Sequence, residues 1–99
     1  MRALYCPGPS YWDEGVKTYA GWWNILEYQR EAIELAGYAV ETPAPPKEAV
    51  ASGPSFARVS SYSAAVAMMT QSEKYDLVVG APSYGFLPML YHPEAMKVV

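Results

Sequence analysis

Cysteine and histidine are nearly absent from this chain of 99 residues, which contains one of each, Cys6 and His92. A single thiol excludes an internal disulfide, and no cluster of these residues has the spacing of metal ligands. Cys6 ends an apolar run, so we expect a buried and unreactive thiol. His92 precedes Pro93, where an exposed turn histidine is the expected state and a general base is the alternative.

Long apolar runs and an excess of basic charge are also missing. No stretch approaches the ~20 apolar residues that a membrane-spanning helix needs, and the N-terminal apolar run is too short for a secretory signal. The net charge of -3 provides no basic face, so we expect neither nucleic acid nor an anionic membrane as a partner. The apolar share of 52% and the charged share of 17% favour a compact domain over a disordered chain, with the cytoplasm as the expected compartment.

Phenylalanine is scarce, whereas tyrosine and tryptophan are abundant: nine Tyr and three Trp stand against two Phe. Rings that carry a polar atom suit half-exposed surfaces, such as the clefts that hold sugars or peptides. We interpret most of these rings as part of the core and its edges. Tyr11, Trp12 and Tyr84 are nominated for ligand stacking because they lie in expected loops, whereas Trp22 and Trp23 are better explained by packing on a helix.

Strand-like and helix-like segments alternate along the chain, which indicates an α/β fold. Gly37 stands where the end of a helix needs a left-handed residue, so a helix is expected to end there and a strand to follow. Strands joined through a helix normally lie parallel, with a right-handed crossover. We therefore predict a single domain over residues 1–99, with a parallel sheet of about three to four strands in a three-layer arrangement. The expected strands are residues 3–6, 38–42, 75–79 and 97–99, the expected helices are 16–36 and 61–73 with a short helix or turn from 86, and a loop or linker covers about 43–54.

Two loops leave the carboxyl ends of expected strands and carry Gly, Ser and Tyr, namely residues 7–15 and 80–85. In open parallel sheets, ligands bind at the carboxyl ends of the strands, where the strand order reverses. If the first and third strands are neighbours, these two loops face one another and form the binding crevice. The expected substrate-binding residues are Ser10, Tyr11, Trp12, Asp13, Ser83, Tyr84 and Gly85.

Other chemical candidates are weaker. Asp13 and Glu14 form an adjacent carboxylate pair that suits acid-base chemistry or a bound cation, but a cap at the start of a helix is the more common role. Ser83 lacks the flanking glycines of a hydrolase nucleophile, and residues 80–85 lack the Gly-Lys-Ser/Thr of a phosphate-binding P-loop. We therefore expect no metal site and assign no catalytic residue.

Four segments together carry a family resemblance: residues 1–6, residues 15–18 at the opening of a long helix, residues 34–40 and residues 74–88. In this order they resemble the N-terminal segment of retaining glycosyltransferases of the GT-B fold, similar to glycosyltransferase family 4. The resemblance spans nearly the whole chain. Its strand-loop-helix motifs also occur in other nucleotide-dependent α/β proteins.

The resemblance implies a Rossmann-like, partial N-terminal half of a GT-B fold, which holds a sugar, glycolipid or glycan acceptor. A nucleotide-sugar donor is then a substrate, no further cofactor is implied, and the donor phosphates approach the loop at Glu14 and Gly15. The family commonly has a glycine at the position of Glu14. Its usual histidine follows the strand at residues 97–99, and its paired acidic motif lies in a missing C-terminal domain. The resemblance therefore implies a truncated chain that does not transfer sugar by itself.

A second interpretation is a small noncatalytic α/β binding or interaction protein. The strand expected at residues 97–99 stops where an apolar run is expected to continue, which leaves an open sheet edge. Such an edge can be hidden by forming a homodimer. The sequence that follows Val99 and the oligomeric state would discriminate between the two interpretations.

Overall fold

The computed structural model of the chain describes residues 1–12, 20–46, 55–80 and 84–98. Four strands form one all-parallel sheet in the order β2-β1-β3-β4, so the predicted α/β fold with a parallel sheet is confirmed. The architecture is consistent with a Rossmann-like α/β fold. The strands are β1 (Arg2–Cys6), β2 (Ala39–Glu41), β3 (Leu77–Gly80) and β4 (Met96–Val98), and the helices are the 3-10 helix η1 (Pro9–Trp12), α2 (Ala20–Leu35), α3 (Ser55–Thr70) and α4 (Phe86–Tyr91).

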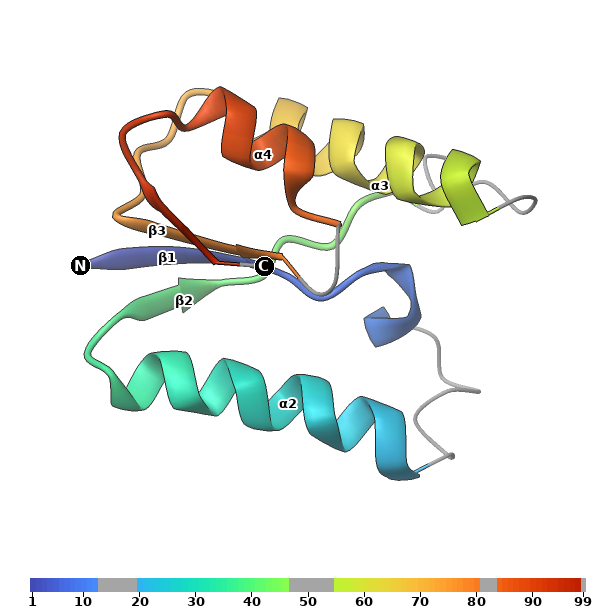
Figure 1. The fold of residues 1–99 in the computed structure, drawn as a ribbon, viewed down its shortest axis with the longest axis vertical. Helices are drawn as coiled ribbons and strands as arrows, with labels where there is room; N and C mark the ends of the chain where they lie inside the picture. Colours follow the sequence, from blue (N-terminus) through green and yellow to red (C-terminus); the bar gives the residue numbers. More distant parts are fainter. Residues whose placement is uncertain (13–19, 47–54, 81–83, 99) are drawn as a thin grey trace.

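The helices lie on both faces of the sheet, as Figure 1 shows: α2 covers one face, while α3 and α4 lie side by side on the other. Alternate residues of β1 point to opposite faces. The hydroxyl of Tyr5 reaches α2, 3.0 Å from the carbonyl oxygen of Leu26, whereas Leu4 and Cys6 belong to the core beneath α3. Fully or nearly buried residues of that core are Leu4, Cys6, Tyr62, Val66, Tyr75, Val78 and Ala95.

Helix α2 covers only part of its face of the sheet. In the parallel register, Leu77 pairs with Met96 and Val79 pairs with Val98, and paired residues point to the same face. Because Ala3 pairs with Leu77, these side chains lie on the α2 side of the sheet. Met96 is 65% exposed and Val98 is 45% exposed, so no described helix covers β4 on this side.

Several boundaries differ from the predicted ones. The left-handed end of α2 is confirmed, since Gly37 has φ +101°. The helix predicted over 61–73 instead spans Ser55–Thr70. Its Ser63 side chain is buried and donates a hydrogen bond to the carbonyl oxygen of Tyr84. Residues 13–19 and 47–54 lie outside the described residues, so the start of the first predicted helix and most of the linker have no described structure.

No helix in the described ranges is both long and apolar enough to cross a membrane.

Candidate functional site

The carboxyl ends of β1 and β3 lie next to each other. Leu4 pairs with Val78 and Cys6 pairs with Gly80, so the two strands end at the same level of the sheet. From β1 the chain first crosses to β2 on one side, and it then returns through α3 to β3 on the other. The strand order therefore reverses between β1 and β3, which is where ligands bind in open α/β sheets.

Close backbone packing brings the described residues that follow β1 and β3 together at this edge. Gly8 has φ +98°, and a side chain added to it would lie 2.7 Å from the ring of Tyr84. Gly80 and Gly85 approach each other just as closely, since a Cβ on Gly80 would lie 2.7 Å from the Gly85 nitrogen. Only glycine allows these approaches, and they place the segment after β3 directly against the segment after β1.

Three aromatic residues form what we call the Tyr62 cluster: Trp12, Tyr62 and Tyr84. The ring of Tyr62 lies 6.1 Å from that of Trp12 and meets the ring of Tyr84 edge-on at 5.5 Å. Trp12 and Tyr84 are half-buried against the core, whereas Tyr62 is fully buried. Two of the nominated stacking residues are thus brought together, and Tyr62 on α3 joins them.

Sequence reasoning missed Tyr62, although a signal was present. Tyr62 lies four residues before Val66, so both occupy one face of a helix, and Val66 is an apolar residue of that helix. The serines at positions 60, 61 and 63 obscured this spacing, because they reduce the apolar character at the start of the predicted helix.

Tyr11 contacts this cluster through Trp12, whose ring it meets edge-on at 5.1 Å, and it also reaches α2. Its hydroxyl donates a 2.5 Å hydrogen bond to Glu27, and its ring stacks on Trp23 at 5.9 Å. The indole N–H of Trp23 donates to the carbonyl oxygen of Tyr11 at 3.1 Å. Burial and the bond to Glu27 raise the pKa of Tyr11 to about 12. The expected packing role of Trp23 is therefore confirmed, whereas Tyr11 has a protein partner on its ring where a ligand was expected.

The remaining predicted site residues divide into two groups. Ser10 lies in η1, and Gly85 lies at the start of α4, so both belong to the edge between β1 and β3. Four others, Asp13, Glu14, Gly15 and Ser83, lie outside the described residues.

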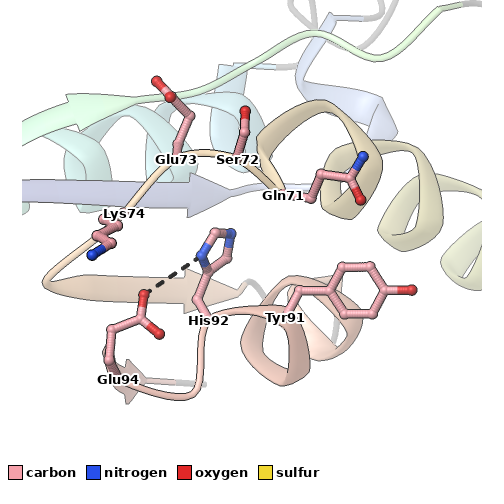
Figure 2. Close-up of a pocket in the computed structure, with 7 residues that line it drawn as sticks. All are labelled: Gln71, Ser72, Glu73, Lys74, Tyr91, His92 and Glu94. Carbon is pink, nitrogen blue, oxygen red and sulfur yellow. Dashed lines mark ion pairs between the residues drawn. The ribbon is translucent and has the colours of Figure 1, made fainter.

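A second candidate site lies at the opposite edge of the sheet, where β3 and β4 begin. An open pocket of about 370 Å³ is lined by residues from the turn after α3, from the end of α4 and from the segment after α4 (Figure 2). These are Gln71, Ser72, Glu73, Lys74, Tyr91, His92 and Glu94.

His92 is buried, with 1% of its surface exposed, so the expected exposed turn histidine is wrong. The hydroxyl of Thr70 donates its proton to the carbonyl oxygen of Val66 at 2.8 Å, and its oxygen lies 3.3 Å from Nε2 of His92. Because the hydroxyl proton is already used, Nε2 carries a proton and donates it to Thr70. Nδ1 then faces the Glu94 carboxylate at 3.8 Å. His92 is buried because it packs against α3. The two segments are distant in the sequence, so this contact cannot be read from the residues next to His92.

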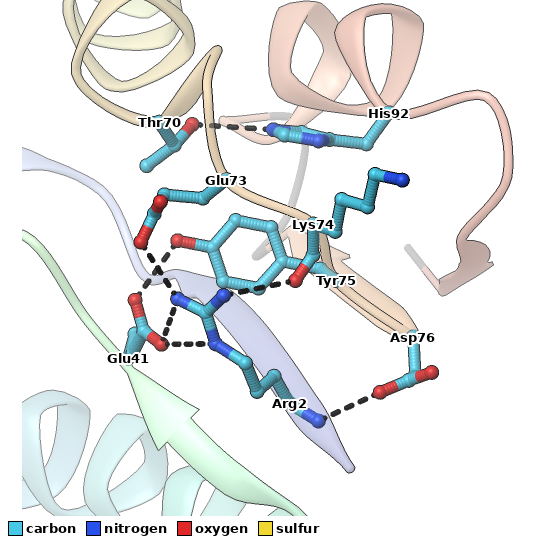
Figure 3. Close-up of polar contacts among 8 residues, drawn as sticks. All are labelled: Arg2, Glu41, Thr70, Glu73, Lys74, Tyr75, Asp76 and His92. Atoms are coloured by element: carbon cyan, nitrogen blue, oxygen red, sulfur yellow. Dashed lines mark hydrogen bonds and ion pairs between the residues drawn. The ribbon is translucent and has the colours of Figure 1, made fainter.

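An ionic network lies beside this pocket (Figure 3). The Arg2 guanidinium pairs with Glu41 and Glu73, and it lies 4.9 Å from the centre of the Tyr75 ring. The hydroxyl of Tyr75 donates to Glu41 at 2.9 Å, and the backbone N–H of Arg2 donates to Asp76 at 2.8 Å. These contacts join β1 and β2 to the segment before β3, which indicates a structural role.

Cys6 is fully buried, as expected, and burial raises the pKa of its thiol to about 12. Among the described residues, no three potential ligands lie close enough to hold a metal ion. Cys6 therefore provides no reactive thiol at the end of β1.

Comparison of the chain with protein-family models, with curated proteins and with solved structures gives no match.

Proposed function

We propose that this chain is the acceptor-side, N-terminal domain of a glycosyltransferase, which binds a sugar acceptor at the edge between β1 and β3. One observation carries the proposal: the strand order reverses between these two strands, and half-buried Trp12 and Tyr84 lie at that point. In the proposed reaction a nucleotide-sugar is the donor, and a second domain supplies the donor site and the reacting groups. The donor contact at Glu14 and Gly15 stays a prediction.

The chemistry of the Tyr62 cluster supports a sugar as the ligand. A pyranose presents an apolar face of C–H groups together with hydroxyl groups around its rim. Aromatic rings that are half-buried offer a flat apolar surface to such a face, and their polar atoms meet the hydroxyls. The half-buried rings of Trp12 and Tyr84 fit this requirement better than they fit an ionic ligand.

The proposal is tested by titrating the isotope-labelled chain with methyl glycosides of glucose, galactose and mannose and following the backbone amide signals by NMR. We expect shifts at Gly8, Trp12 and Gly85 and none at the pocket around His92. Replacing Tyr84 by Ala removes a ring at the site, so Tyr84→Ala is expected to weaken binding about tenfold.

The matched control is Tyr91→Ala, which removes a 53% exposed tyrosine at the opposite edge and should leave the affinity unchanged. Thermal unfolding of both variants checks that each is folded at the temperature of the titration. Shifts confined to the His92 pocket, or the absence of binding by all three glycosides, would contradict the proposal.

A second candidate function, an interaction module that dimerises, is favoured by the surface of β4. In the described part of the chain, β4 pairs with β3 alone, and all three of its residues are exposed. Unpaired backbone groups beside apolar side chains are a template for a further strand. Light scattering should then give the mass of a dimer for the purified chain and the mass of a monomer for Val98→Asp. A monomeric mass for the unchanged chain at every concentration would exclude this candidate.

A further inference from the structure

One ring nitrogen of His92 makes no hydrogen bond within the described part of the chain. Because Nε2 donates its proton to Thr70, Nδ1 of the neutral ring carries a lone pair and can only accept. The group that Nδ1 faces is the Glu94 carboxylate, 3.8 Å away, and a carboxylate also can only accept (Figure 2). Two hydrogen-bond acceptors therefore face one another in the pocket, and the donor between them is missing.

A second proton on the ring is a poor solution to this arrangement. It would place a charged imidazolium on a side chain that is only 1% exposed, and a buried charge is unfavourable without a hydrogen-bonded counter-ion. The distance of 3.8 Å between Nδ1 and Glu94 is too long for that hydrogen bond. It does leave room for one nitrogen of a ligand that lies about 2.9 Å from both acceptors.

The pocket has room for a ligand larger than water. Its volume is about 370 Å³, whereas a water molecule occupies roughly 30 Å³ and pockets for small ligands begin at roughly 300 Å³. A carboxylate binds a charged donor more strongly than a neutral one. A primary ammonium group has three N–H groups, so it can donate to Nδ1 of His92 and to Glu94 at once. These two acceptors therefore suit an ammonium group better than a hydroxyl.

Lys74 brings a positive charge to the same pocket. No carboxylate among the described residues pairs with its ammonium group, and the neighbouring Glu73 pairs with Arg2. The Lys74 ammonium can therefore pair with a carboxylate of the ligand. A ligand that carries both an ammonium group and a carboxylate matches Glu94 and Lys74 together, whereas a ligand with one charge leaves one of them unpaired.

We propose that the pocket around His92 binds a free α-amino acid, whose ammonium group donates to His92 and Glu94 and whose carboxylate pairs with Lys74. The pocket lies where β3 and β4 begin, at the opposite edge of the sheet from the site proposed for the sugar acceptor. This inference is therefore independent of the proposed function. His92 serves as a neutral hydrogen-bond acceptor, and no covalent bond is made or broken.

His92 is the only histidine of the chain, so nitrogen NMR of the isotope-labelled protein reports its ring without ambiguity. At mildly alkaline pH, where histidine is ordinarily neutral, the free chain should carry a proton on Nε2 and none on Nδ1. Added L-alanine should shift the Nδ1 signal. Ethylamine and propionate each carry one of the two charges, so each should bind at least tenfold more weakly than alanine.

Two variants with the same change of charge complete the test. Glu94→Gln introduces an amide N–H that can donate to Nδ1 within the chain, so the affinity for alanine should fall at least tenfold. Glu31→Gln changes an exposed residue of α2, on the other face of the sheet, and should leave the affinity unchanged. Thermal unfolding of both variants checks that they are folded.

The remaining outcomes would each overturn the inference. A proton on Nδ1 in the free chain would mean that the two acceptors do not face one another. Equal affinities of Glu94→Gln and the unchanged chain would exclude the ammonium contact, and ethylamine binding as tightly as alanine would exclude the amino acid. If no probe moves the Nδ1 signal, water alone bridges the acceptors. None of these results bears on the glycoside titration, which tests the proposed function separately.

Discussion

At the scale of single residues, two glycines have nearly the same positive φ angle but meet different surroundings. Gly8 has φ +98° and Gly37 has φ +101°. A side chain at Gly8 would lie 2.7 Å from the ring of Tyr84, whereas a side chain at Gly37 would have no atom within 4 Å. The same substitution at both positions therefore separates the backbone strain of a left-handed residue from the cost of a close side-chain contact.

Gly8→Ala is therefore expected to lower the free energy of unfolding more than Gly37→Ala does. Backbone strain alone accounts for roughly 1 kcal/mol in each variant. Displacement of the Tyr84 ring should add about 1 to 2 kcal/mol in Gly8→Ala only. Urea unfolding of the two variants measures the difference, and equal losses would show that Tyr84 does not lie on Gly8.

At the scale of the elements, the ends of α3 and α4 are joined through a buried hydrogen bond between Thr70 and His92. Thr70→Val keeps the shape of the side chain but leaves the N–H of the buried imidazole without an acceptor. The expected loss of stability is about 1 to 3 kcal/mol. Thermal or urea unfolding measures it.

Thr70→Ser serves as the control, because it keeps the acceptor and removes only a methyl group. The serine variant should retain more stability than the valine variant. The opposite order would mean that Thr70 stabilises the helix ends through packing and that the hydrogen bond contributes little.

At the scale of the whole molecule, local patterns predicted the elements, but contacts between distant segments decided the site. The helix end at Gly37 and the parallel sheet follow from residue type and element order, and both are confirmed. The burial of His92 depends on α3 and α4 packing against each other, which no local spacing encodes. The half-covered face at β4 likewise depends on where α2 lies.

The strand order also has a consequence for how the chain folds. β1 is made first during synthesis, yet it lies inside the sheet, with β2 on one side and β3 on the other. The amide of Arg2 finds its partner in Asp76, 74 residues later in the chain. Until those residues emerge from the ribosome, one side of the most buried strand has no partner, and pairings this distant form slowly. The nascent chain must keep β1 from aggregating during that interval.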